Sequence, residues 1–231
     1  MLYYITLIAA SIVALVFSIV RAKGASVNNL YFKMISSLCF MLIAVVGVIQ
    51  NPDASLLGVL IIMGGALGLS GDVALDLKYV YLKDSHPHLI AGFLFFLVGH
   101  VFYNAAIILF ASLDWIKVLI CVAISVVLSF ITVQSGKLLK IEYGKYKLIA
   151  LLYGLSLVMT TCTSVTAYVI TQSKAMLIFA IGAVMFLISD LILSKIYFAK
   201  DSVKPVPVCL NHIFYYGGQI AIAASVVFLN A

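Results

Sequence analysis

Long apolar runs dominate this sequence, and short polar connections separate them. Each run has about 20 residues, which is the length that a helix needs to cross the hydrocarbon core of a bilayer. Of all residues, 65% are hydrophobic and only 10% are charged, and a soluble domain of this size cannot bury so much apolar surface. The sequence therefore predicts a polytopic membrane protein and excludes disordered chains, nucleic-acid-binding proteins and disulfide-stapled secreted domains.

We predict eight membrane spans, all of them helical, because the runs are too long for barrel strands and do not alternate in polarity. The first run is interpreted as a retained span, since Arg21 and Lys23 follow it, whereas a signal peptide carries its basic residues in front. Together the spans would form one all-α integral membrane domain, an eight-helix bundle of residues 1–231. The predicted spans are 2–20, 31–49, 56–77, 89–111, 116–134, 148–170, 175–197 and 208–229.

Basic residues gather on one side of the predicted bundle. Only Lys117 and Lys174 fall on the opposite side. By the positive-inside rule, the basic side faces the cytoplasm and both termini face away from it. We expect a bacterial cell (inner) membrane, and the net charge of +6 then reports orientation. The twelve residues of the basic side are Arg21, Lys23, Lys33, Lys78, Lys83, Lys137, Lys140, Lys145, Lys147, Lys195, Lys200 and Lys204.

The two halves of the chain carry rare polar residues in the same order. GALGLSGDVALDLKYVYLKD in the third span resembles GAVMFLISDLILSKIYFAKD in the seventh, and GHVFYNAA in the fourth resembles NHIFYYGG in the eighth. Four helices per half would make the halves parallel, related by an axis along the membrane normal. We therefore predict two pseudo-repeats, approximately residues 1–112 and 113–231. The shared residues are Lys33, Asp72 and His100, and again Lys147, Asp190 and His212.

Three acidic residues lie within predicted spans, where an ionisable group costs about 2.5–3.5 kcal/mol on insertion scales. Asp72 and Asp190 lie at matching depth, roughly 8–9 Å inside the basic ends of their helices. This favours one shared polar cavity, although a buried pair that only ties the bundle together is the alternative. Asp76 is one turn nearer the interface, and we expect its side chain to reach water there. The other acidic residues are expected to be solvated: Asp53, Asp84, Asp114, Glu142 and Asp201.

Polar side chains also form stripes on the fourth and eighth spans. Because hydrocarbon offers them no partners, these stripes should face the interior of the bundle. For His100, a structural role and a functional role are left equally open. A hydroxyl cluster on the sixth span is predicted to bond its own helix or a neighbouring one. The stripes are His100, Tyr103 and Asn104, and His212, Tyr215, Tyr216 and Gln219; the cluster is Thr160, Thr161, Thr163, Ser164 and Thr166.

Cysteine and histidine give no sign of a metal centre. The four cysteines stand singly and have neither the spacing of a disulfide framework nor that of zinc ligands. Only two histidines fall within spans, whereas a zinc hydrolase would need about three that converge. We expect no metal and no other cofactor.

At its polar positions the sequence resembles the lysoplasmalogenase family, also called YhhN-like membrane proteins. The resemblance covers nearly the whole chain, and it rests on an ordered set of short motifs rather than on any one of them. Two features depart from the family pattern: Met34 replaces the usual Pro after Lys33, and His212 precedes a Gly pair. The matching positions are Lys33, Ser70-Gly71-Asp72, Gly99-His100 with Tyr103, Gly182-Ala183 through Ser189-Asp190, and Tyr215-Tyr216 with Gln219.

The resemblance implies hydrolysis of the vinyl ether of a lysoplasmalogen to a fatty aldehyde and a glycerophospho-ethanolamine or -choline. This chemistry needs one carboxylic acid to protonate the outer alkene carbon and one carboxylate to stabilise the cation and activate water. Two neighbouring buried carboxyls can divide these roles, because one of them keeps its proton. We hypothesise that Asp72 and Asp190 are this pair, and the sequence leaves open which is the acid.

The remaining polar residues are expected to bind the substrate. Lys33 would hold the headgroup phosphate or orient the water. The expected partners are a lysophospholipid substrate and the surrounding membrane lipids, without nucleic acid, and a homodimer is left open. The candidate substrate-binding residues are Lys33, Ser70, His100, Tyr103, Asn104, Ser189, His212, Tyr215, Tyr216 and Gln219.

The main alternative function is a proton-coupled transporter of small solutes or lipids. Parallel repeats with an intramembrane acidic pair also occur in such carriers. An intramembrane aspartyl protease fits less well, because Ser189 and not Tyr precedes Asp190 and the sequence contains no Pro-Ala-Leu.

Overall fold

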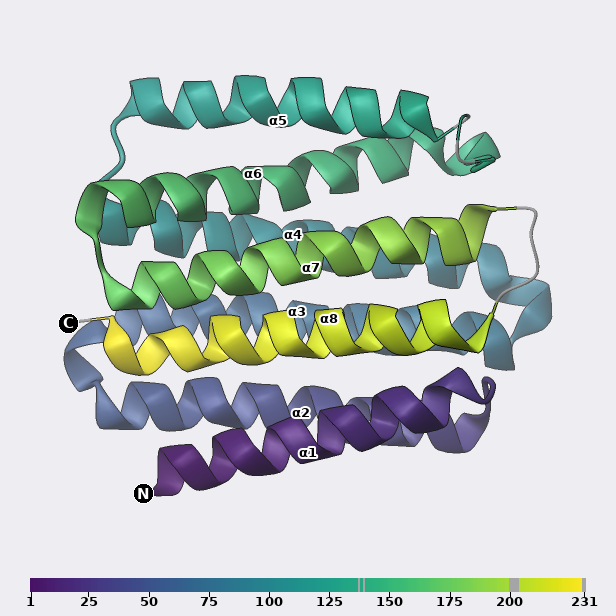
Figure 1. Ribbon diagram of the computed structural model, residues 1–231, viewed down its shortest axis with the longest axis horizontal. Coiled ribbons are helices and arrows are strands. Elements are labelled where there is room, and N and C mark those ends of the chain that lie inside the picture. Colours follow the sequence, from purple (N-terminus) through teal and green to yellow (C-terminus); the bar gives the residue numbers. More distant parts are fainter. Residues whose placement is uncertain (137, 139, 200–203, 230–231) are drawn as a thin grey trace.

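The computed structural model describes residues 1–136, 138, 140–199 and 204–229, and every named element in them is helical (Figure 1). Lys137, Lys200 and Asp201, which entered the predictions above, lie outside the described residues. The long helices are α1 (Leu2–Ala22), α2 (Val27–Gln50), α3 (Ser55–Val80), α4 (Ser85–Ala111), α5 (Trp115–Ser135), α6 (Lys147–Thr171), α7 (Lys174–Phe198) and α8 (Pro205–Ser225). The 3₁₀ turns are η1 (Pro52–Ala54), η2 (Leu82–Asp84), η3 (Gly144–Tyr146) and η4 (Val226–Phe228).

Seven helices in the described part of the chain, α1 to α7, are long and apolar enough to cross a membrane. The chain is therefore a multi-pass membrane protein. Helix α8 is not among the seven, although it has 21 residues, as many as α1. Its polar residues Asn211, His212 and Gln219 lower its hydropathy, and all three are buried in the bundle. A crossing by α8 and the orientation of the bundle stay predictions.

The helices form two layers, visible in Figure 1 as a front and a fainter back row. The front layer has the order α1, α8, α7, α6, and the back layer has the order α2, α3, α4. Helices α2 and α3 contact α8 across the layers, and α4 contacts α6 in the same way. Helix α5 lies at the edge of the bundle and packs on α6. The centre of the molecule is thus bounded by α2, α3, α4, α7 and α8.

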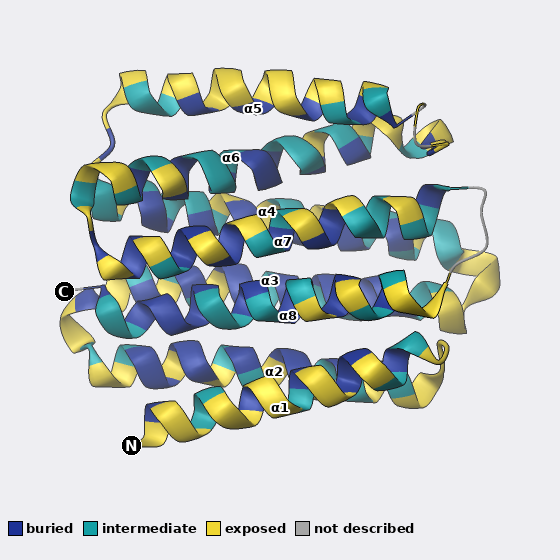
Figure 2. Cartoon of the chain, viewed as in Figure 1, coloured by how far each residue is buried: buried dark blue, intermediate teal, exposed yellow. Residues whose placement is uncertain are grey.

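Polarity is arranged with apolar side chains outside and polar ones inside. Figure 2 shows exposed residues along the outer faces of α1 and α5 and buried ones towards the centre. Outward side chains such as Ile12, Leu119 and Ile131 are more than half exposed, which suits a hydrocarbon surrounding. Lys33, Asp72 and other charged residues are instead almost fully buried. An ionisable side chain in a membrane protein needs such internal partners, because lipid supplies none.

Glycines bring the helices of two pairs into backbone contact. On α3 and α4, Gly64 faces the carbonyl of Gly99; on α7 and α8, Gly182 faces the carbonyl of Gly218. Small residues at helix interfaces allow this close approach in membrane bundles. Both helix pairs pack closely through facing glycines. The division of the chain into two pseudo-repeats stays a prediction.

The hydroxyl cluster of α6 acts as predicted. Thr160, Thr161 and Thr163 each donate to the carbonyl oxygen of their own helix one turn earlier. The Thr160 hydroxyl also contacts Asn104 and His100 of α4, and Thr163 donates to the amide oxygen of Asn104. The cluster therefore joins α6 to α4, as expected for polar side chains between membrane helices.

Replacing Gly182 with Ala should destabilise the protein by about 1–3 kcal/mol, the usual cost of overpacking. An added Cβ would lie 2.7 Å from the Gly218 carbonyl oxygen and 3.0 Å from the Ile222 nitrogen, and these backbone atoms cannot move aside. Thermal unfolding in detergent measures the effect. Gly154→Ala on α6 is the control, because in the described part of the chain the nearest atoms to its Cβ would be those of Ser129, at 4.0 Å. Equal melting temperatures for the two variants would contradict this packing.

Candidate active site

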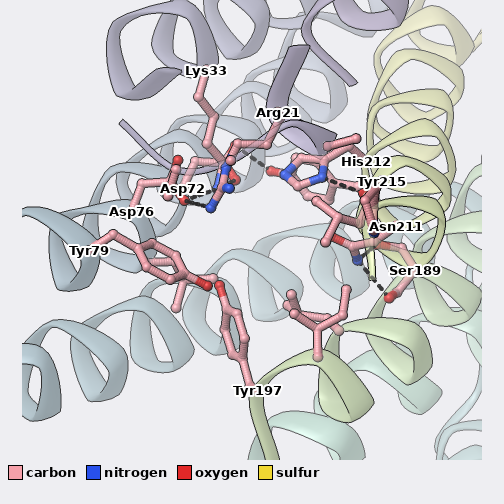
Figure 3. A pocket seen from close by; sticks show the side chains of 18 of the residues that line it. Arg21, Lys33, Asp72, Asp76, Tyr79, Ser189, Tyr197, Asn211, His212 and Tyr215 are labelled. Atoms are coloured by element: carbon pink, nitrogen blue, oxygen red, sulfur yellow. Dashed lines mark hydrogen bonds and ion pairs between the residues drawn. The ribbon is translucent and has the colours of Figure 1, made fainter. Parts of the chain in front are cut away.

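A cavity of about 350 Å³ lies inside the bundle, and side chains from α1, α2, α3, α4, α7 and α8 line it (Figure 3). Both predicted carboxyls, Asp72 and Asp190, line this cavity. Each lies eight residues before the last residue of its helix, α3 or α7. The equal depth inferred from the sequence therefore corresponds to one shared space.

Asp72 is held by three donors from two other helices. The Lys33 Nζ lies 3.2 Å from Oδ1, and the hydroxyls of Ser37 and Tyr215 each donate to Oδ2 over 2.7 Å. Donors of this kind favour the charged form of a carboxyl group. The surroundings of Asp72 thus suit a carboxylate fixed in one orientation.

Lys33 also bonds a second carboxylate, Asp76, whose Oδ1 lies 3.3 Å from Nζ. Arg21 reaches the same Asp76 oxygen at 3.8 Å. The expectation that Asp76 extends to water is wrong: the residue is 5% exposed. The Asp76 side chain faces inward because it pairs there with Arg21 on α1 and Lys33 on α2. Together Arg21, Asp76, Lys33 and Asp72 form what we call the ion network, in which two cations neutralise two carboxylates.

Asp190 has different surroundings. Its Oδ2 accepts a hydrogen bond from the hydroxyl of Tyr153 on α6. Among the described residues, no Lys, Arg or His side chain forms an ion pair with it. A buried carboxylate without a counter-ion is costly, so Asp190 differs chemically from Asp72, although both line the cavity.

A chain of side chains connects Asp72 with the middle of the bundle. Tyr103 donates to the Oε1 of Gln219 over 2.8 Å, and the Nε2 of Gln219 lies 3.4 Å from the hydroxyl of Tyr215. Tyr215 in turn donates to Asp72. Tyr216 contacts the Ser37 hydroxyl and the carbonyl of Lys33, each at 3.3 Å. These predicted residues orient the groups that hold Asp72, and of them only Tyr215 lines the cavity.

His212, Ser189 and Asn211 form another part of the cavity wall. The Nδ1 of His212 lies 2.8 Å from the carbonyl oxygen of Val208, so Nδ1 carries the proton and Nε2 of a neutral ring is an acceptor. Asn211 donates to the carbonyl and hydroxyl oxygens of Ser189. This wall offers water or substrate a hydrogen-bonding surface opposite the ion network.

Besides Tyr103, Tyr216 and Gln219, three further predicted site residues do not line the cavity. The Nδ1 of His100 lies 3.0 Å from Thr160, and its ring contacts Phe186. Asn104 is engaged by the hydroxyl cluster of α6, and Ser70 donates to the carbonyl of Ala66 on its own helix. The surroundings of these three residues indicate that they help to pack the helices together.

Sequence reasoning did not find several functional candidates. Arg21 was counted only as an orientation signal, and Ser37 and Tyr153 stood unnoticed in apolar runs. For Ser37, its position one turn after Lys33 on the same helix face was an available signal. For Tyr153 no pattern in its own span marks it, because its partner is on another helix.

Metal binding has little support in the described part of the chain. There, no three His, Cys, Asp or Glu side chains come together in a way that could hold an ion.

Replacing Lys33 with Met should destabilise the protein by about 3–5 kcal/mol, because it leaves two buried carboxylates with one cation fewer. Lys147→Met on α6 is the matched control, since Lys147 is exposed. Thermal unfolding of both variants in detergent checks this. A loss of stability no larger for Lys33→Met than for the control would contradict the assigned ion network.

The chain was compared with known proteins. No curated protein and no solved structure matches it. The model of the YhhN family matches residues 28–226, a region that contains Lys33, Asp72, Asp76, Asp190 and every predicted substrate-binding residue. The match covers most of the chain and agrees with the family resemblance of its motifs, so the chain belongs to the YhhN family.

Proposed function

We propose that this protein is an intramembrane hydrolase that cleaves the vinyl ether bond of lysoplasmalogens. The observation that carries the proposal is the pair of unlike carboxyls in one cavity. Asp72 is paired with a cation, whereas Asp190 has a tyrosine partner and no ion pair among the described residues. Vinyl ether hydrolysis needs such a pair, one group to give a proton and one to accept it.

The different surroundings of the two carboxyls support one division of the roles that the sequence left open. Asp190 is the general acid, because the absence of a counter-ion favours its neutral form. Asp72 is the carboxylate, because Lys33, Ser37 and Tyr215 donate to it. The nearby Nε2 of His212 helps to orient the attacking water.

The reaction begins when Asp190 gives its proton to the outer alkene carbon, whose π electrons form the new C–H bond. The resulting oxocarbenium ion is stabilised by the carboxylate of Asp72. Water adds to the carbon attached to oxygen and gives a proton to Asp72, which leaves a hemiacetal. In its collapse the ether C–O bond breaks, Asp72 protonates the departing glycerol oxygen, and Asp190 takes the hemiacetal proton. Both carboxyls thereby return to their first state. The division of work between an acid and a carboxylate that activates water is similar to that of inverting glycosidases.

The headgroup phosphate is assigned to Arg21 and not to Lys33. The Nζ of Lys33 is already occupied by two carboxylates. Arg21 lines the cavity together with Lys23 and Lys204. Its Nε is buried and has no hydrogen-bond partner among the described residues. An arginine with a donor to spare suits a phosphate group.

Replacing Asp190 with Asn, or Asp72 with Asn, should lower aldehyde release from a lysoplasmalogen by about 10²–10⁴-fold, the usual contribution of a general acid or base. The measurement uses purified protein in detergent. Asp114→Asn is the control: Asp114 caps α5 at the surface, and Asn caps a helix equally well.

Thermal unfolding would show that the variants are folded. Turnover within tenfold of wild type in either active-site variant would contradict the assigned roles. Proton-driven solute uptake into liposomes by a wild-type protein that releases no aldehyde would favour the transporter instead.

Replacing Arg21 with Gln should raise the KM for a lysoplasmalogen about 10–100-fold, because a hydrogen bond to a charged group contributes about 1.5–3 kcal/mol. Turnover of an alkenylglycerol, which has no phosphate, should be unaffected. Lys117→Gln, near the start of α5, serves as the control. An equal loss with both substrates would mean that Arg21 acts through Asp76 and not on the phosphate.

A further inference from the structure

Asp190 also lines a second cavity, of about 190 Å³. Side chains from α4, α5, α6 and α7 bound it, and most of them are apolar. Its walls include Phe93, Leu157, Val158, Leu187 and Phe198. It carries none of the lysines or arginines that line the first cavity.

Among the residues that the structure describes, Asp190 is the one that lines both cavities. Its partner Tyr153 lines the second cavity, and the ring of Tyr153 packs against Phe93 and Phe96 at centroid distances of 5.5 and 6.1 Å. Phe96 in turn lines the first cavity. The Asp190–Tyr153 pair therefore stands where a charged space meets an apolar one.

The second cavity reaches the outer surface of the bundle. Leu128 on α5 and Leu191 on α7 line it and are 45% and 48% exposed. Both lie on helices that are long and apolar enough to cross a membrane. The lining of the second cavity thus includes side chains of α5 and α7 that are exposed on the outside of the bundle.

We propose that this second cavity binds the hydrocarbon chain of a single-chain ether lipid, with the chain leaving the first cavity past Asp190. The inference rests on the proposed function. In a vinyl ether lipid the reactive bond joins a polar glycerophosphate to an alkyl chain. When the alkene lies at Asp190 and the phosphate lies at Arg21, the chain must continue away from the charged cavity, and the second cavity begins there.

Chain selection at this site is steric. A chain that moves from bilayer to protein exchanges one apolar surrounding for another, so no hydrophobic gain favours a particular length. The shape of the walls then decides which chains place their alkene at Asp190. A bulkier wall should therefore change the chain-length preference and leave the acid–base groups untouched.

Gly154 on α6 provides the variant that tests this. It lines the second cavity, and a Cβ there would have only Ser129 of α5, at 4.0 Å, as a near neighbour. Gly154→Phe should project into the cavity and lower turnover of a hexadecenyl substrate at least tenfold relative to a hexenyl substrate. Leu152→Phe, on the lipid-facing side of α6, is the control. An unchanged ratio of the two rates in Gly154→Phe would overturn the inference.

A second measurement does not depend on catalysis. A saturated ether lysolipid with a diazirine at the end of its chain cannot be hydrolysed and labels whatever its chain touches. We expect labelled peptides to contain Leu128, Leu157 or Val158, and Gly154→Phe to lose the label. Labelling of these peptides without aldehyde release would refute the proposed function and would still support a binding site for the hydrocarbon chain. Aldehyde release with labels elsewhere would refute the chain site alone.

Discussion

The need to neutralise buried charge shapes this bundle more than any other constraint. Lys33 lies between Asp72 and Asp76, and Arg21 completes the network from α1. No single helix could keep such charges in hydrocarbon, because each alone costs several kcal/mol. When α1, α2 and α3 pack together, their charged side chains form ion pairs, and these offset the cost of burying the charges. This packing also leaves Asp190 on α7 as a carboxyl outside the network.

The proposed reaction depends on this asymmetry between Asp72 and Asp190. Two identical carboxyls would compete for the same proton, whereas a paired and an unpaired carboxyl can divide the work of an acid and a base. Tyr103 and Gln219 extend the support of Asp72 through Tyr215, so the carboxylate has little freedom to turn. Asp190, whose hydrogen-bond partner in the described part of the chain is Tyr153, lines both cavities.

Sequence patterns predicted well how far along its helix each polar residue lies. They predicted poorly which neighbouring helix its side chain faces. Hydrophobic length located the helices, and the rise per residue placed Asp72 and Asp190 at one depth. It could not tell that Asp76 faces Arg21, because depth says nothing about which neighbour a helix face meets. For the same reason His100 was grouped with the site, although it packs against Phe186 and Thr160. The eighth predicted span, residues 208–229, falls on α8 and η4, but among the described helices α8 is not one of the seven that are apolar enough to cross a membrane, because its polar side chains face the interior.

The second cavity, whose lining includes the exposed Leu128 and Leu191, would give the products of the proposed reaction separate ways out. A fatty aldehyde released beside Asp190 can diffuse sideways into the bilayer without passing the charged cavity. The glycerophosphate part, held near Arg21, leaves towards water at the end of the bundle. Cleavage would then release the aldehyde into the bilayer and the glycerophosphate into water. Neither product would block the exit of the other, and the two would not meet again to recombine.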